Sequence, residues 1–270
     1  WFKNYKSALD GRGPVSQAIM KRVQEGKTLD LGVWSNALAD DIRHSFGASA
    51  IFPMGAVSKS VTETAGELRP TDDHSRTGLN AATSLEGLRH GLNAYNEIAW
   101  FLELDYFMRV SDVSGAFTLL PLHPDVWPFF MFRFFADESS STAMHLFMHV
   151  CGDFGAAGMP GTFKIFFSDV LCGMARSVNV LTLPMPVYVD DCTLIGKCQT
   201  EVDAQMEAFH AFCAEVCGVF FKVLKDRLAA QVQLALGFVW DSTSLTRTLE
   251  NRKLVSYLEV LAECAVAETL

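Results

Sequence analysis

Two adjacent aspartates, Asp190 and Asp191, interrupt an otherwise apolar stretch that reads PVYVDDCTLIG from residue 186 to 196. Aspartate is depleted in strands and favoured in turns, so the stretch predicts a β-hairpin whose tip is Asp-Asp. Acidic hairpin tips are common surface turns. Paired carboxylates at the end of a rigid hairpin would also suit a hard cation. The choice between turn and metal site depends on whether another carboxylate lies on a neighbouring strand.

Asp112 is the best candidate for that further carboxylate. It ends a predicted strand, YFMRVSD, and the following VSGAF leaves the sheet directly after the acid. A carboxylate at a strand end can face a pair at a hairpin tip across neighbouring strands. Two-metal nucleotidyl transfer needs such a set, because cations about 3.5–4 Å apart clamp the attacking and leaving oxygens. Taken alone, Asp112 would be interpreted as a helix N-cap.

A second set of metal-binding residue types occurs at His145, His149 and Cys151. The two histidines fall on one face of a predicted strand, where alternating polar residues are ordinary, so we assign no metal to them. The seven cysteines are odd in number and scattered, and Cys213 and Cys217 have no second pair at metal spacing. Free thiols in a reducing compartment are the better interpretation.

The composition supplies enough apolar material for a core that could position these carboxylates. Half of the 270 residues are hydrophobic and 21 are Phe, which suits one large domain or two modest ones. The charged share of 20% excludes a disordered or coiled-coil chain. No apolar run approaches the roughly 18 residues of a membrane span, and no signal-peptide pattern follows Trp1. We expect a piece of a longer protein, working in the cytoplasm or nucleus without a membrane partner.

The predicted strands and helices are mixed without strict alternation, which favours an α+β fold with a sheet covered by helices. A hairpin is expected where two apolar runs, residues 128–136 and 143–151, flank a polar tip. Thr200 and Asp203 have capping-box-like spacing at the start of one helix, and Gly218 suits its C-cap. Helices are expected over residues 13–44, 84–103, 162–178, 200–217 and 251–268, and further strands over 51–60, 106–112 and 234–241.

Five short segments resemble the motifs of reverse transcriptases. They are, in chain order, AVSKS with ELRPTDDHSRTGLN, SDVSGAFTLLPLHPD, FGAAGMPGTF, YVDD, and KVLK followed by LALGFVWD. They are similar, respectively, to the fingers strands, the first catalytic motif, the nucleotide-pocket loop, the third motif, and a lysine-bearing segment with its Leu-Gly strand. YVDD alone is a weak match, whereas five motifs in the right order over residues 51–255 are strong. The similarity is greater to retrotransposon polymerases than to viral or telomeric ones.

The resemblance implies a two-metal centre built from the aspartates. Asp112 and Asp190 would bind two Mg²⁺ or Mn²⁺ ions, the backbone carbonyl of Val113 would help, and Asp191 would support them. Oxygen ligands suit magnesium, and phosphoryl transfer consists mostly of positioning and charge neutralisation.

The resemblance also implies a nucleotide pocket. Phe117 matches an aromatic beneath the sugar, where a ring would clash with a 2′-hydroxyl and favour deoxynucleotides; a core Phe is the alternative. Phe154, Gly155 and Pro160 match the loop that shapes the pocket and carries the template, although a glycine-rich loop also serves as an ordinary turn.

Basic residues complete the implied site. Lys59 and Arg69 match the fingers residues that would grip the triphosphate, Arg by bidentate contact and Lys as a point charge. Solvated surface charge is the alternative for both. Lys222 or Lys225 could protonate the leaving pyrophosphate, and Lys225 better fits the spacing to the following Leu-Gly.

A right-hand polymerase fold is implied, with an antiparallel palm sheet covered by helices and a thumb that is largely absent. The expected regions are an N-terminal helical extension (1–50), a first part of the fingers (51–111), a palm (112–240) with a fingers hairpin at about 118–152, and a thumb stub or C-terminal helix (241–270). The implied activity is RNA-directed DNA synthesis on a template-primer duplex of RNA or DNA with dNTPs. Other domains of a parent polyprotein, or a larger complex, would be further partners.

Two features depart from the family pattern. Asp153 stands where the family has a proline before Phe-Gly, and a carboxylate near a triphosphate is unhelpful unless it points away. The net charge of -9 opposes a large nucleic-acid footprint unless the 22 basic residues gather in a cleft. These departures leave an alternative open: a catalytically inactive, reverse-transcriptase-derived scaffold or assembly subunit.

Overall fold

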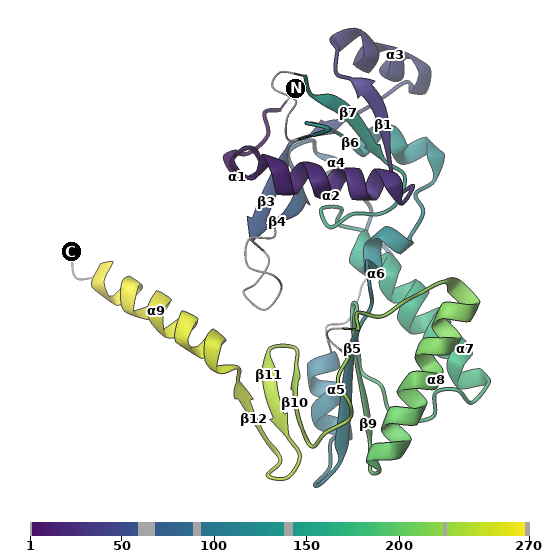
Figure 1. Cartoon of the computed structure of the whole chain (residues 1–270), viewed down its shortest axis with the longest axis vertical. Coiled ribbons are helices and arrows are strands. Elements are labelled where there is room, and N and C mark those ends of the chain that lie inside the picture. Colours follow the sequence, from purple (N-terminus) through teal and green to yellow (C-terminus); the bar gives the residue numbers. More distant parts are fainter. Residues whose placement is uncertain (1, 59–67, 89–92, 138–142, 224–225, 268–270) are drawn as a thin grey trace. The chain divides into compact units, whose positions relative to one another are not determined.

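The chain forms two compact units in the computed structural model, which describes residues 2–58, 68–88, 93–137, 143–223 and 226–267 (Figure 1). The first unit comprises Trp1–Arg89 and Gly115–Phe163, and the second comprises His90–Ser114 and Lys164–Leu270. Every helix among the described residues is too short or too polar to cross a membrane.

The first unit is built around a four-stranded sheet with the order β1-β7-β6-β2. Its strands pair antiparallel except β2 and β6, and a separate antiparallel pair is formed by β3 and β4. The strands are β1 (Thr28–Val33), β2 (Ile51–Phe52), β3 (Met54–Ser58), β4 (Leu68–Asp72), β6 (Met131–Phe134) and β7 (His145–His149). The helices are α1 (Lys6–Asp10), α2 (Arg12–Gln24), α3 (Asn36–Phe46), α4 (Leu79–Ala82), and the 3-10 turns η1 (Ala116–Leu119) and η2 (Pro124–Phe129).

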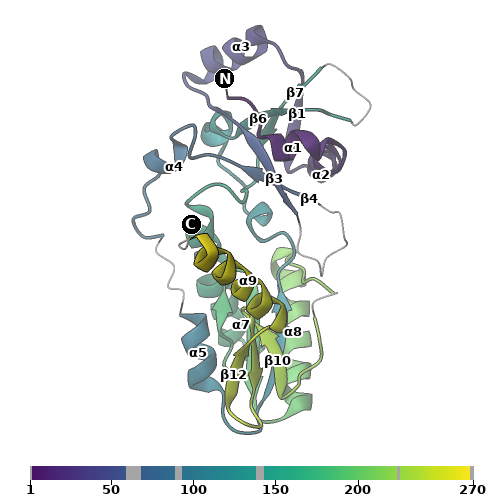
Figure 2. The ribbon, with the colours of Figure 1, turned by 90° about the vertical axis from the view of Figure 1, so that its left-hand side faces the viewer.

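The alternation of apolar residues along β6 gives this sheet two buried faces. Phe132 packs in one cluster with Ile19 of α2, whereas its neighbour Met131 packs in another with Leu38 of α3. Successive strand residues point to opposite faces. Helices α2 and α3 therefore cover opposite sides of the sheet (Figure 2).

Two helix predictions in the first part of the chain are wrong in extent. The expected helix over 13–44 is interrupted by β1, because Gly26, at φ 69°, ends α2 in the left-handed conformation that favours glycine. The helix expected over 84–103 is shorter and begins at Ala94. The predicted hairpin is confirmed, since β6 pairs antiparallel with β7; its tip, residues 138–142, lies outside the described residues.

The second unit holds two three-stranded antiparallel sheets, with the orders β5-β9-β8 and β10-β11-β12. The strands are β5 (Phe107–Asp112), β8 (Val187–Tyr188), β9 (Asp191–Gly196), β10 (Val232–Ala235), β11 (Phe238–Asp241) and β12 (Thr246–Leu249). The helices are α5 (Ala94–Phe101), η3 (Ile165–Leu171), α7 (Cys172–Ser177), α8 (Gln199–Cys217) and α9 (Asn251–Ala267). Helix α6 (Met159–Lys164) runs across the division into η3, which is a π-helix.

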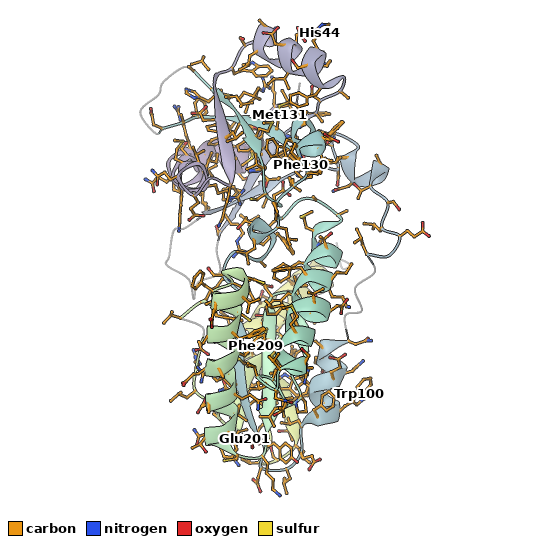
Figure 3. All side chains as sticks on the ribbon, turned by 90° about the vertical axis from the view of Figure 1, so that its right-hand side faces the viewer. His44, Trp100, Phe130, Met131, Glu201 and Phe209 are labelled. Atoms are coloured by element: carbon orange, nitrogen blue, oxygen red, sulfur yellow. The ribbon has the colours of Figure 1, made fainter. Side chains whose placement is uncertain are left out.

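Helices cover both faces of the β5-β9-β8 sheet. Met108 of β5 packs in a core cluster with Ile98 of α5, whereas the next residue, Arg109, reaches Asp203 of α8. Phe209 of α8 is fully buried, and Figure 3 shows it inside the unit. The predicted α+β architecture, an antiparallel sheet covered by helices, is confirmed.

Two local predictions in this unit needed correction. The segment LALGFVWD is a hairpin rather than one strand, because Leu236 (φ 52°) and Gly237 (φ 81°) turn the chain between β10 and β11. Helix α8 begins after Cys198 and has no side-chain cap, since the carboxylate of Asp203 accepts instead from the backbone N–H of Ala229. The predicted C-cap at Gly218 is confirmed by its left-handed φ of 63°.

Candidate active site

A tight hairpin between β8 and β9 presents the two adjacent aspartates. Tyr188 pairs with Asp191, so the turn consists of Val189 and Asp190. The expected Asp-Asp tip is wrong by one residue, because Asp191 is already the first residue of β9 and belongs to the ladder. Val189 has a φ of 55°, which is a strained conformation for a β-branched residue. The turn therefore stores strain next to Asp190.

The register between β5 and β9 brings the third aspartate to the same end of the sheet. Asp112 lies directly opposite Asp191. The backbone N–H of Val113 donates to the carbonyl oxygen of Asp190 over 2.9 Å. Asp112 is only 4% exposed, whereas the Asp190 side chain is 30% exposed. One carboxylate is thus nearly buried and another is open to solvent.

Lys222 contributes the positive charge among these acids. Its backbone N–H donates to the carbonyl of Asp112 over 2.8 Å, and its neighbour Phe221 forms a β-bridge with Val113. Its ammonium donates to the Asp112 carboxylate and lies 4.0 Å from that of Asp190. Of the two lysines considered from the sequence, the structure brings Lys222 to the aspartates; Lys225 lies outside the described residues.

The arrangement is suited to binding a cation. The carboxylates of Asp112 and Asp190 converge on one positive group, the Lys222 ammonium. Asp191, opposite Asp112 in the ladder, and the carbonyl of Val113 could offer further oxygens. Hard cations such as Mg²⁺ and Mn²⁺ prefer oxygen ligands, so the residues present fit the implied metals.

Arg109 is a buried arginine that was not predicted as a functional residue. Its ion pairs hold several elements of the second unit together. Arg109 is 4% exposed and forms ion pairs with Asp226 (2.7 Å), Asp203 (3.1 Å) and Glu207 (3.4 Å). Burial lowers the pKa of Arg109, but the hydrogen bond and charge of Asp226 outweigh burial and raise it overall. A lone Arg inside an apolar strand was the available sequence signal. The network ties β5, α8 and the segment after Lys222 together.

Three of the predicted nucleotide-binding residues lie together in the first unit. The ring centroids of Phe117 and Phe154 are 5.1 Å apart, and the guanidinium carbon of Arg69 lies 5.6 Å from the Phe154 ring. Phe154 is 45% exposed, whereas Phe117 is only 8% exposed. The burial of Phe117 also agrees with the alternative interpretation, in which it is a core residue. The cluster offers an exposed aromatic surface beside a positive charge.

The remaining predicted pocket residues are placed as follows. A side chain on Gly155 would come within 1.8 Å of the carbonyl oxygen of Asp72, so the close approach of the loop to the end of β4 requires glycine. Pro160 is the second residue of α6. Lys59 lies outside the described residues.

Asp153, the residue that departs from the family pattern, points into the interior of the first unit. Its side chain is fully buried, and one oxygen accepts from the backbone N–H groups of Gly155 and Ala156. The other oxygen lies 2.7 Å from Nε2 of His74. These bonds organise the loop that carries Phe154.

No family model matches the chain, and no curated protein matches it. Several solved structures, by contrast, match the chain in fold. The foamy viral protease-reverse transcriptase in complex with double-stranded DNA is 18% identical over 93% of this chain and 36% of that chain, with a TM-score of 0.61. The native prototype foamy virus protease-reverse transcriptase is 16% identical, with a TM-score of 0.64, over 93% of this chain and 28% of the other. The chain therefore spans about a third of such proteins and has their reverse-transcriptase polymerase fold, with palm and fingers.

Proposed function

We propose that the chain is the reverse transcriptase domain of a retroelement, of the retrotransposon kind, and adds dNTPs to a primer 3′ end. The observation that carries the proposal is the convergence of Asp112 and Asp190 on the ammonium of Lys222, at the end of a sheet in a polymerase-like fold. The carboxylates that could hold catalytic cations thus lie beside a proton donor.

The aspartates would hold two Mg²⁺ or Mn²⁺ ions, with Asp112 and Asp190 as the main ligands and Asp191 and the Val113 carbonyl in support. When bound, such ions supply charge neutralisation and alignment for in-line phosphoryl transfer. In the proposal Lys222, or Lys225, carries a proton toward the leaving pyrophosphate.

Phe117, Phe154, Gly155 and Pro160 are assigned to the nucleotide and template, and Arg69 and Lys59 to the triphosphate. The support for this assignment is the cluster of Arg69, Phe117 and Phe154, because an arginine and an exposed ring provide charge and stacking surface. Phe117 would select deoxynucleotides.

The partners in this proposal are a template-primer duplex and dNTPs, together with other domains of a parent polyprotein or a larger complex. Solved neighbours include one foamy viral enzyme with an RNA/DNA hybrid and others with double-stranded DNA. The regions proposed are the N-terminal extension (1–50), fingers (51–111), palm (112–240, with a fingers hairpin at about 118–152) and thumb stub (241–270).

A second candidate function is a catalytically inactive scaffold. The observation that favours it is the net charge of -9, which weakens the attraction for nucleic acid.

Primer extension separates the two functions. The chain is incubated with an RNA template, a DNA primer, dNTPs and Mg²⁺ or Mn²⁺, beside Asp190→Asn and the control Asp125→Asn, whose side chain is 86% exposed. We expect extension by the wild type and the control, and its loss in Asp190→Asn. Equal extension by all three would contradict the assigned site, and no extension with either metal would favour the scaffold.

A further inference from the structure

Three buried side chains in the first unit form a polar cluster far from the aspartates in sequence. Asp72 ends β4, His149 ends β7, and Asp153 begins the glycine-rich loop. Each offers one ligand atom, and these atoms all lie within 4.8 Å of one another. The side chains of Asp72 and Asp153 are fully buried, and that of His149 is 2% exposed.

Three side-chain atoms of the cluster lack hydrogen-bond partners in the described part of the chain. Neither carboxylate oxygen of Asp72 accepts a hydrogen bond, and Nε2 of His149 has no partner. The atoms Asp72 Oδ2 and His149 Nε2 face each other at 3.6 Å, which is too long for a hydrogen bond. Buried polar groups are nearly always paired, so these atoms indicate an absent partner between them.

The spacing of these two atoms is that of two ligands on one small cation. Zinc binds imidazole nitrogen and carboxylate oxygen at roughly 2.0–2.2 Å, which places two ligands of a tetrahedral ion about 3.3–3.6 Å apart. The guanidinium of Arg22 does not supply the missing hydrogen bond, since its nitrogen lies 3.7 Å from Asp72 Oδ2.

The outer contacts of the cluster are those of metal ligands. Nδ1 of His149 lies 2.8 Å from the hydroxyl of Thr28, and donation by Nδ1 leaves the Nε2 lone pair facing Asp72. Nε2 of His74 lies 2.7 Å from the carboxylate of Asp153. Metal-bound histidines and carboxylates are commonly oriented by such second contacts.

The charge balance of the cluster also calls for a cation. Of the two buried carboxylates, Asp72 lies beside the guanidinium of Arg22 and Asp153 beside the imidazole of His74.

We propose that Asp72, His149 and Asp153 bind one zinc ion that fastens β4, β7 and the Phe154 loop together. Mixed nitrogen and oxygen ligands suit zinc, and water would complete a tetrahedral set. This structural ion is separate from the cations proposed for Asp112 and Asp190.

The test measures zinc content and melting temperature, and therefore needs no polymerase activity. The variant is His149→Gln, and the matched control is His145→Gln, because His145 lies on the same strand and pairs with the half-exposed Asp30. After dialysis we expect about one zinc per chain in the wild type and the control, and at least a tenfold weaker affinity in His149→Gln. Asp190→Asn should keep its zinc.

Cobalt substitution keeps the proposal testable if His149→Gln fails to fold. The wild type should take up one Co²⁺ with the visible absorption of a tetrahedral site, and excess Zn²⁺ should displace it. A wild-type chain that binds neither ion, and whose melting temperature is unchanged by Zn²⁺ or by chelator, overturns the proposal, as does zinc that is lost in Asp190→Asn but kept in His149→Gln. A proton shared by Asp72 and His149 would then account for the cluster.

Discussion

Lys222 occupies a position in which one side chain can serve both as a counter-ion and as an acid. Its ammonium bonds to Asp112 and lies 4.0 Å from Asp190, so it neutralises the repulsion between the two carboxylates. Cations bound by the aspartates would take over that neutralising role. The ammonium would then be available to a leaving group.

Replacing Lys222 tests this second role. We expect Lys222→Ala to lower the rate of primer extension about 100-fold, because a positioned general acid contributes at least that much. The control is Lys197→Ala, which removes an exposed lysine of the same unit. A full rate of primer extension in Lys222→Ala would exclude the assignment.

At the scale of elements, the parts of the fold that could be predicted were those with an unambiguous local pattern. Strand β5, the β6-β7 hairpin and the end of α8 at Gly218 follow from apolar runs, a polar tip and one glycine. Strand β1 was missed because Leu31, Trp34 and Leu38 have helical spacing, although the first lies on a strand and the last on α3.

The buried cluster shows why part of the chemistry was not predictable. His149 was set aside because the sequence showed it only as a polar residue on one strand. Its neighbours, Asp72 and Asp153, lie on different elements, and the close approach of Gly155 to Asp72 brings those two elements together. Asp112 and Asp190 could be paired because each ends or precedes a predictable strand.

The β8-β9 turn supports a prediction about strain. Val189 has a φ of 55°, and such a conformation costs about 1–3 kcal/mol in a non-glycine residue. We expect Val189→Gly to stabilise the fold by about 1 kcal/mol, because relief of strain exceeds the entropic cost of glycine, which is at most about 1 kcal/mol. Primer extension should fall, because a looser turn holds Asp190 less firmly.

The comparison variant for this turn is Val187→Gly, two residues earlier in β8. Glycine weakens a strand without relieving any strain there, so urea unfolding should show a lower midpoint for Val187→Gly and a higher one for Val189→Gly. Equal destabilisation by both substitutions would mean that the Val189 backbone is not strained.

For the molecule as a whole, charge is divided unevenly between the units. The second unit has 10 basic and 17 acidic residues, a net charge of -7 out of the total of -9. The excess negative charge thus lies in the unit that carries Asp112, Asp190 and Asp191. Bound cations would offset it, so binding of a nucleic acid to this unit should depend on divalent ions as well as on salt.

The stability of the second unit should also depend on pH through His210. This residue contacts Ser111 of β5 over 2.9 Å and stacks on Phe221 with the ring centroids 3.9 Å apart. Burial lowers the pKa of His210, Asp226 and Glu207 oppose that effect, and Arg109 adds to it, so that the pKa lies below its ordinary value. Folding then disfavours the protonated ring.

Acid should therefore destabilise the second unit through His210. The contribution of His210 is fully present above the unfolded pKa of about 6.5 and is lost as the pH falls below it, by at most about 1.4 kcal/mol per pH unit. The free energy of hydrogen exchange of β5, β9 and α8, corrected for the intrinsic exchange rate at each pH, should therefore fall between pH 6.5 and 5.5, and less so in His210→Gln. The control is His44→Gln, an exposed residue of α3 in the first unit, which should behave as the wild type. If His210→Gln keeps the full fall in the free energy of exchange, another group titrates.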